Sequence, residues 1–129
     1  RGKLRARFGG GNGAAGAVEQ DETATFEERV RAIVANNLTD PSFSVEDLAE
    51  EVGLARRTVT RKVKETFGRT PSQLIRAMRV ERGAELLTEE VGTVSEVAYA
   101  SGFNSLSYFS RSFKEHFGVT PSAYQKREA

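Results

Sequence analysis

Apolar residues recur at every third or fourth position along most of the chain beyond residue 24, the spacing that places them on one face of an α-helix. The first such segment begins at Thr25, which together with Glu28 fits a capping box, and we expect Asp40-Pro41 to end it. No segment alternates apolar and polar residues as a half-buried strand does. The pattern therefore predicts an all-α fold.

The same periodicity, together with residues that typically start and stop helices, predicts six further helices. Their expected starts are, in chain order, Ser44, about Arg56, Thr70-Pro71, Thr93, Asn104 or Ser105, and Thr120-Pro121. The fourth of the seven helices is the longest. We expect Gly53, Gly68 and Gly118 to end three of these helices, since glycine adopts the left-handed conformation of a helix end at low cost.

Part of the chain occurs twice. The stretch "FGRTPSQL" at residues 67–74 returns as "FGVTPSAY" at residues 117–124. The apolar residues before these stretches also superpose at an offset of fifty: Val59 on Phe109, Val63 on Phe113 and Phe67 on Phe117. We expect Leu106 to face inward with these phenylalanines. Farther upstream, Gly53 falls on Gly102 at an offset of 49, so the second copy has one extra residue just after its glycine.

Each copy consists of a short helix, a Gly-containing turn and a second helix, which is the outline of a helix-turn-helix. Opposite the apolar face of each second helix lie polar side chains: Arg57, Thr60, Arg61 and Lys64 in the third helix, and Ser107, Tyr108, Arg111 and Lys114 in the sixth. Arginine can bridge two acceptors of guanine, hydroxyls can donate or accept, and lysine pairs with phosphate. A solvated surface explains any one of these charges, but their repetition favours binding in the DNA major groove.

The net charge of +1 conceals an uneven distribution of charged residues. Residues 54–82 carry nine basic residues against two acidic ones, whereas residues 19–51 carry ten acidic residues against two basic ones. The basic stretch fits electrostatic contact with a polyanion such as nucleic acid. On charge alone, a solvated helix face explains it equally well.

Composition excludes several classes of site. Cysteine is absent, so the chain has no disulfide, thiolate metal site or cysteine nucleophile, and His116 is the only histidine. No apolar run is long enough to cross a bilayer. The adjacent pairs Glu27-Glu28 and Glu89-Glu90 point in different directions on helices and have no evident catalytic partner. We therefore expect no enzyme, no catalytic residue, no metal and no cofactor.

A resemblance to a known family lies in residues 96–124, "EVAYASGFNSLSYFSRSFKEHFGVTPSAY", which are similar to the signature segment of AraC/XylS-type bacterial transcription regulators. The resemblance covers roughly residues 26–127, and "LAEEVGLARRTVTRKVKETFGRTPSQLIRAMRVERGAELL" matches more loosely. It implies a DNA-binding domain over residues 25–129, with helix-turn-helix units at about 44–67 and about 93–117 joined by a long helix at about 71–88. In the family, the two recognition helices enter successive major-groove faces of one double-stranded DNA site.

Carried over position by position, the resemblance implies which side chains touch DNA. The base-facing residues are Arg57, Thr60 and Arg61 in the first unit and Ser107, Tyr108 and Arg111 in the second. The implied phosphate contacts are Arg56, Lys64, Asn104, Ser105 and Lys114. Two departures weaken the first unit: Ala55 stands where the family usually has a helix-capping serine, and Val63 replaces the commoner phenylalanine.

The resemblance also implies partners beyond DNA. We expect a transcription regulator in the bacterial cytoplasm, an activator or a repressor, with RNA polymerase as a second partner and no membrane contact by this fragment. The stretch "LRARF" at residues 4–8, followed by a Gly- and Ala-rich linker at residues 9–17, is similar to the tail of a response-regulator receiver domain. Residues 1–24 are therefore expected to be a linker and the tail of an upstream receiver or sensor domain, as in hybrid two-component proteins.

The alternative to a DNA-binding domain is a helical protein-interaction module that docks an acidic partner through its basic face.

Overall fold

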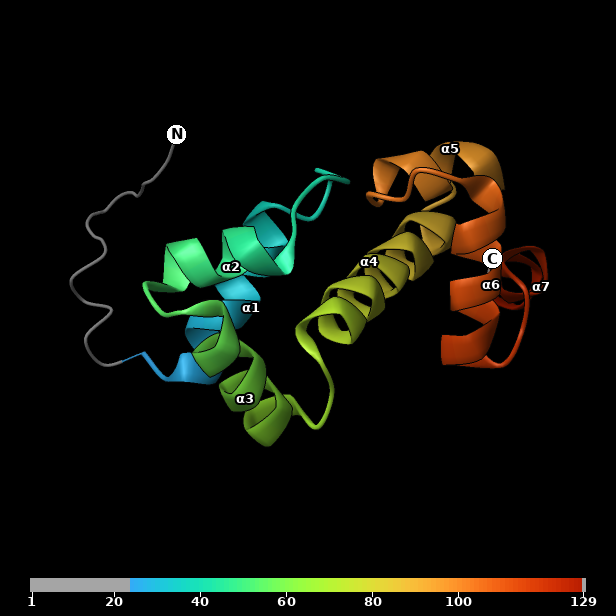
Figure 1. Cartoon of the computed structure of the whole chain (residues 1–129). Coiled ribbons are helices and arrows are strands. Elements are labelled where there is room, and N and C mark those ends of the chain that lie inside the picture. Colours follow the sequence, from blue (N-terminus) through green and yellow to red (C-terminus); the bar gives the residue numbers. More distant parts are fainter. Residues whose placement is uncertain (1–23, 129) are drawn as a thin grey trace. The chain divides into compact units, whose positions relative to one another are not determined.

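A computed structural model describes residues 24–128 of the chain. Over this range it consists of helices joined by turns, without a strand, as the apolar spacing predicts. The helices are α1 (Phe26–Asn36), α2 (Val45–Val52), α3 (Arg56–Phe67), α4 (Pro71–Thr88), α5 (Val94–Ala100), α6 (Leu106–Phe117) and α7 (Pro121–Glu128) (Figure 1). The chain forms two compact units, residues 1–32 and 33–129, and every helix from α2 onward belongs to the second. The linker predicted at residues 9–17 and the "LRARF" stretch at residues 4–8 lie outside the described residues.

Local side-chain capping sets most of the helix starts, in line with the sequence. Four helices begin with a reciprocal capping box, formed by the pairs Thr25 and Glu28, Ser44 and Asp47, Thr70 and Gln73, and Thr93 and Glu96. Ser105 caps α6 and Thr120 caps α7 through single hydrogen bonds of 3.0 and 3.2 Å. Among the described helices, α3 begins at Ala55 without a side-chain cap, as its sequence predicts. Gly53, Gly68 and Gly118 end α2, α3 and α6 in the left-handed conformation.

The end of α1 differs from the sequence-based expectation. We expected Asp40-Pro41 to end this helix, but it stops at Asn36. The Nδ2 group of Asn37 donates to the carbonyl oxygen of Ile33 at 2.8 Å, and a turn follows. Asparagine side chains compete in this way with the backbone bonds that would continue a helix. A loop over residues 37–44 therefore leads into α2.

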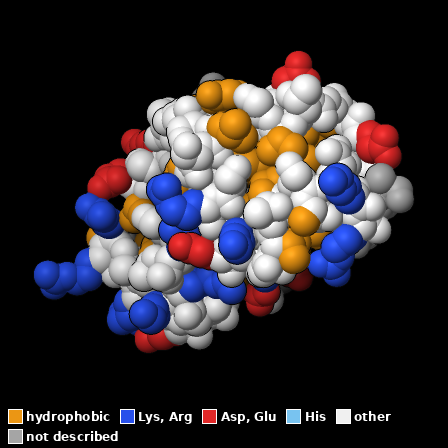
Figure 2. Space-filling model, turned by 90° about the vertical axis from the view of Figure 1, so that its right-hand side faces the viewer, with side chains coloured by type: hydrophobic (Ala, Val, Ile, Leu, Met, Phe, Trp, Pro, Cys, Tyr) orange, Lys and Arg blue, Asp and Glu red, His pale blue; other side chains and the backbone are white. Residues whose placement is uncertain are grey.

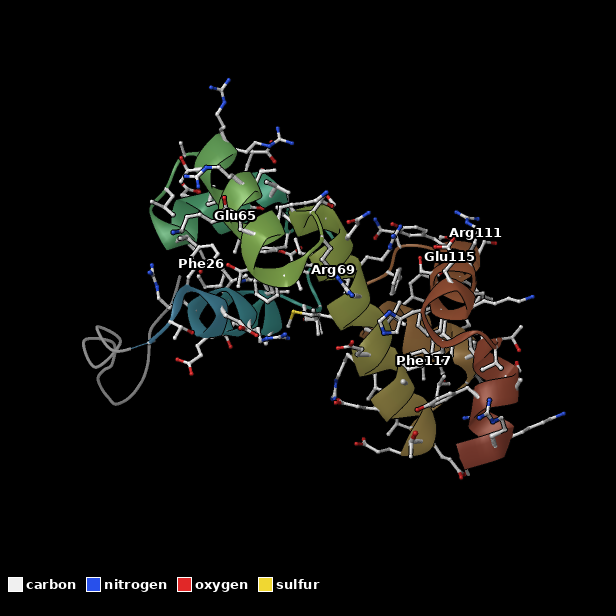
Figure 3. All side chains as sticks on the ribbon, turned by 90° about the horizontal axis from the view of Figure 1, so that it is seen from below. Phe26, Glu65, Arg69, Arg111, Glu115 and Phe117 are labelled. Atoms are coloured by element: carbon white, nitrogen blue, oxygen red, sulfur yellow. The ribbon has the colours of Figure 1, made fainter. Side chains whose placement is uncertain are left out.

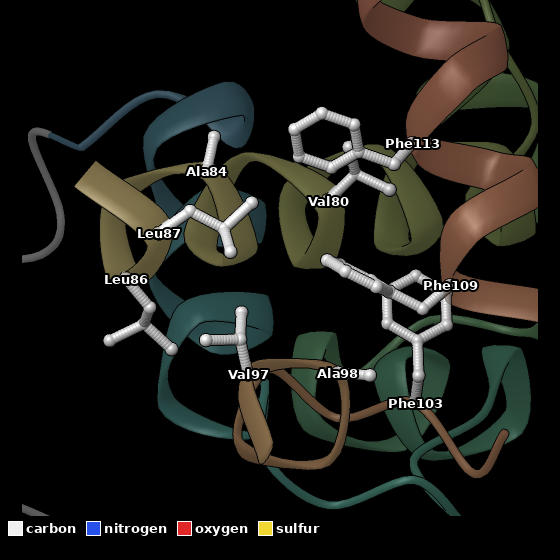
Figure 4. Packing of buried hydrophobic residues seen from close by; sticks show 9 residues of the cluster. All are labelled: Val80, Ala84, Leu86, Leu87, Val97, Ala98, Phe103, Phe109 and Phe113. Carbon is white, nitrogen blue, oxygen red and sulfur yellow. The ribbon is translucent and has the colours of Figure 1, made fainter. Parts of the chain in front are cut away.

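The second helix-turn-helix unit has an aromatic core between α4, α5 and α6. Its buried members are Val80, Ala84, Leu86, Leu87, Val97, Ala98, Phe103, Phe109 and Phe113 (Figure 4). Gly83 allows α6 to approach α4 closely, since a Cβ at this position would lie 2.6 Å from the Phe109 ring. Leu106 was expected in this core but is 40% exposed. It is the first residue of α6, and a side chain at the end of a helix has fewer neighbours than one in the middle.

The first helix-turn-helix unit is built from smaller side chains. The buried side chains of α2 are Val45, Leu48, Ala49 and Val52. Val59 and Val63 of α3 are fully buried, as are their counterparts Phe109 and Phe113 in α6. α3 packs against α2 and α4, and α4 also packs against α5, α6 and α7. α4 is therefore the long helix that links the two units, as the resemblance implied.

Neither α4 nor any other helix in residues 24–128 combines the length and apolar character that a membrane span requires. Across the same residues, no group of three or more histidines and carboxylates is placed to hold a metal ion.

Candidate nucleic-acid interface

The outer face of α3 carries the three base-reading candidates of the first unit. Arg57 and Arg61 are exposed, and Thr60 is half-buried. Because residues three and four apart share one side of a helix, these side chains lie opposite Val59 and Val63, which are buried. Lys64, a phosphate candidate, is exposed in the last turn of α3 on the same side as Arg61. Because Val59 and Val63 are buried, the polar side chains on the opposite side of α3 face outward.

The outer face of α6 repeats this arrangement. Ser107, Tyr108 and Arg111 are exposed, opposite the buried Phe109 and Phe113. Lys114 is exposed in the last turn, at the position that corresponds to Lys64. Figure 3 shows Arg111 and Glu115 one helical turn apart on α6. The structure therefore brings the second set of predicted residues onto one accessible face as well.

Tyr108 is held from two sides. Its ring packs edge-on against the buried Phe103 with 5.4 Å between ring centroids. The guanidinium carbon of Arg111 lies 5.7 Å from the centroid of the Tyr108 ring, within the range of a cation–π contact. Two side chains expected to read bases are thus positioned by each other and by the core.

Two of the basic residues expected to contact DNA in the first unit form ion pairs. Arg56 pairs with Glu46 of α2 at 2.7 Å, and Arg61 approaches Glu65 of its own helix at 3.5 Å. All four side chains are more than half exposed, so these pairs stabilise the fold little and are screened by salt. Arg56, expected to contact phosphate, would have to exchange the Glu46 carboxylate for a phosphate oxygen.

The N-terminal ends of α3 and α6 differ in whether a side chain caps their first-turn N–H groups, and so in the donors that are available to an anion. At α6, the Ser105 hydroxyl accepts a hydrogen bond from the Tyr108 N–H at 3.0 Å, and Asn104 beside it is exposed. At α3, Ala55 has no side-chain oxygen, so no side-chain cap occupies the first-turn N–H groups. Free N–H groups at a helix start favour negatively charged ligands such as phosphate. Ser105 therefore has a structural role in addition to its predicted phosphate contact.

Arg79 of α4 is a residue to which the sequence assigned no role. Its Nε donates to the carbonyl oxygen of Leu38 at 3.1 Å and its Nη2 to that of Asp40 at 2.8 Å. Partial burial lowers the pKa of Arg79, and the nearby Asp40 and Tyr108 oppose that shift. In the sequence, the only sign of a role for Arg79 was its position in the basic stretch of residues 54–82. That position does not distinguish Arg79 from the other basic residues of the stretch.

Figure 2 shows Lys and Arg side chains spread across one face of the molecule, with hydrophobic side chains between them. Leu106, the first residue of α6, and Tyr108 on its outer face are both 40% exposed. Charged and apolar groups exposed together suit a surface that meets both phosphates and base edges.

Comparison with known proteins places this geometry in context. Residues 48–127 match the protein family described as "Helix-turn-helix domain". Histidine kinase P4 from Formosa agariphila is 37% identical over 95 residues, which cover 74% of this chain and 7% of the kinase. Other curated relatives are named as transcriptional activators or regulators, and the chain spans 25% to 38% of their length.

Two solved structures share both fold and sequence features with the chain. The DNA-binding domain of AdpA, a global transcriptional factor solved in complex with a target DNA, is 31% identical with a TM-score of 0.71. That similarity covers 77% of this chain and 88% of the AdpA chain. A transcriptional regulator from Chromobacterium violaceum, described as AraC-type, is 29% identical with a TM-score of 0.73 over 78% of this chain and 88% of its own.

Proposed function

Because this chain belongs to the AraC/XylS-type family of helix-turn-helix domains, the DNA-binding output domains of transcription regulators, we propose that α3 and α6 enter successive major-groove faces of one DNA site. The observation that supports this proposal is the repeated outer face, where Arg61 and Arg111 occupy equivalent positions opposite buried sides. The 18 residues of α4 make it about 27 Å long. With its flanking helices, it is compatible with the roughly 34 Å of one duplex turn.

Individual side chains take two kinds of role in this proposal. The base-reading residues are Arg57, Thr60, Arg61, Ser107, Tyr108 and Arg111, and the phosphate contacts are Arg56, Lys64, Asn104, Ser105 and Lys114. An arginine on a recognition helix can bridge O6 and N7 of one guanine, and the contact between Arg111 and Tyr108 would limit the orientations that this guanidinium samples. At α3, a phosphate would take the place of the missing cap.

The full-length protein has further proposed partners. An upstream receiver or sensor domain would control the DNA-binding domain, and the name of the histidine kinase P4 relative supports a two-component setting. RNA polymerase would be the second partner, in the cytoplasm. The domain described here would act by binding alone, without a catalytic step.

Selection of bound sequences from a random duplex pool tests the proposal directly. We expect enrichment of one site with two constrained base blocks about one helical turn, or roughly 10 base pairs, apart. Affinity for that site should be about 10⁻⁸ M or tighter and should fall steeply with salt, because neutralised phosphates release counterions. A pool that remains random after repeated rounds would refute sequence-specific binding.

A heparin control separates this proposal from the alternative, a module that docks an acidic partner through its basic face. Both hypotheses predict that the chain is retained on heparin, because heparin presents negative charge without a base sequence. If the chain is retained on heparin yet binds the selected site and a shuffled duplex equally, the interaction module is favoured. Discrimination between the two duplexes supports DNA reading.

A further inference from the structure

The loop after α1 is bound to the middle of α4 by one guanidinium. Arg79 donates from Nε to the Leu38 carbonyl and from Nη2 to the Asp40 carbonyl, at 3.1 and 2.8 Å. These carbonyls lie 41 and 39 positions before Arg79 in the chain. The loop leads into α2, the first helix of the first helix-turn-helix unit. The two bonds therefore attach the entrance of the first unit to the linking helix.

The turn of the second unit meets the same loop. Gly102 has a φ of 99°, and a Cβ built on it would lie 2.1 Å from the Leu38 carbonyl oxygen and 2.8 Å from Arg79 Nε. No side chain other than hydrogen fits between these groups. Gly102 follows α5, so the loop that leads into the first helix-turn-helix unit and the turn of the second unit meet at the Arg79 side chain.

The loop also has hydrogen bonds of its own. The Asp40 carboxylate accepts from the N–H and the hydroxyl of Ser42 at 3.0 and 2.7 Å. These bonds and the Arg79 charge lower the pKa of Asp40. Because the bonds between Asp40 and Ser42 do not involve Arg79, we expect replacement of Arg79 to detach the loop from α4 without unfolding the domain.

We propose that Arg79 is a positioning residue that sets the separation and angle between α3 and α6, and so determines which base-pair spacing between half-sites the domain accepts. This inference rests on the proposed function. Each inserted base pair moves a half-site by about 3.4 Å and rotates it by about 35°. A domain with its two units held together cannot follow that displacement, whereas a domain without the Arg79 bonds can.

The experiment uses the 129-residue chain and the duplex site chosen by selection. Affinities are measured for that site and for versions with one base pair inserted or removed between its constrained blocks. We expect the wild-type chain to lose at least about tenfold in affinity for either altered site. For Arg79→Met, which keeps the length and apolar stem of the side chain, we expect the loss to shrink to about threefold or less.

Two further variants make the result specific. Arg82→Met removes another arginine of α4, whose ion pair is with Glu85 of the same helix, and should keep the wild-type spacing preference. Arg79→Lys keeps the charge but loses the planar fork that bonds two carbonyls, so it should broaden the accepted spacing at nearly unchanged affinity for the selected site. If Arg79→Met does not fold, as judged by circular dichroism, Arg79→Lys decides.

The outcomes separate this inference from the function on which it rests. Failure of the wild-type chain to select any site would refute the proposed function. If the wild-type chain is selective but both Arg79 variants keep its spacing preference, the positioning role is wrong. Equal weakening of all three sites by Arg79→Met would also overturn it, because a phosphate contact or a general loss of stability has that signature.

Discussion

The two helix-turn-helix units share a topology but differ in how it is stabilised. The first connects its helices through residues 53–55, which end on the uncapped Ala55. The second uses residues 101–105, which end on the capping Ser105. From its glycine to its recognition helix the second turn is one residue longer, as the offsets of 49 and 50 predicted.

Their cores differ as well. In the second unit Phe103, Phe109, Phe113, Phe117 and Tyr124 form a chain of ring contacts, with centroids 4.7 to 5.6 Å apart from one ring to the next. In the first unit Val59 and Val63 stand at the positions of Phe109 and Phe113. Both units nevertheless present the same polar spacing outward. The position of a reading face therefore follows from helix periodicity, whereas its stability depends on the core behind it.

The largest expected difference is in core truncation. Phe109→Ala should lower the free energy of unfolding by about 3–5 kcal/mol, because it leaves a cavity against α4. Val59→Ala, its counterpart in the first unit, should cost about 2 kcal/mol, since fewer buried carbons are lost. Urea unfolding followed by circular dichroism measures both. Equal costs would show that the aromatic core adds no more stability than the valines of the first unit.

Truncating one arginine on each recognition helix compares the contributions of α3 and α6 to DNA affinity. Arg111→Ala and Arg61→Ala should each cost about 1–3 kcal/mol on the selected site and relax specificity at one base position. Lys114→Ala should instead weaken binding uniformly across sequences and reduce the salt slope by about 1. Affinities on single-base variants of the site distinguish these patterns. If Arg111→Ala binds all duplexes as the wild type does, the base-reading role of α6 is wrong.

Exchanging the residues that precede α3 and α6 tests whether helix capping explains the difference in stability between the two units. Ala55→Ser should stabilise the domain by about 1 kcal/mol, because the hydroxyl can accept from a first-turn N–H of α3. Ser105→Ala should destabilise it by a similar amount, through loss of the bond from the Tyr108 N–H. Thermal unfolding of both variants and of the double variant gives these values. An unchanged midpoint for Ser105→Ala would indicate that another group replaces this cap.

The smallest effect is expected at the ion pair between α2 and α3. Glu46→Gln removes the negative charge next to Arg56, and the stability change should stay below about 1 kcal/mol because both side chains are exposed. DNA affinity at low salt should rise slightly, since Arg56 no longer exchanges a carboxylate for a phosphate. Titrations at two salt concentrations measure this gain, and a lower affinity would argue against a phosphate contact by Arg56.

Local features of the chain were sufficient to predict much of the fold and of the candidate interface. Capping pairs such as Thr93 and Glu96 are three residues apart, so their chemistry is visible in the sequence and sets where helices begin. The exposed spacing of Arg57 and Arg61 follows from helix geometry in the same way. Their contacts with DNA are predictions that truncation of the arginines tests.

The exposure of Leu106 and the role of Arg79 required the tertiary structure, whereas the bond given for the end of α1 joins Asn37 and Ile33, four positions apart. Leu106 had a local pattern compatible with two outcomes, and its surroundings decided between them. Arg79 bonds carbonyls 39 and 41 positions away and lies against the turn of the second unit. By itself the sequence determined that this chain has two helices suited to reading DNA. Only the packing of distant segments decided how those helices are held together, because side-chain partners far apart in sequence leave no periodic signal.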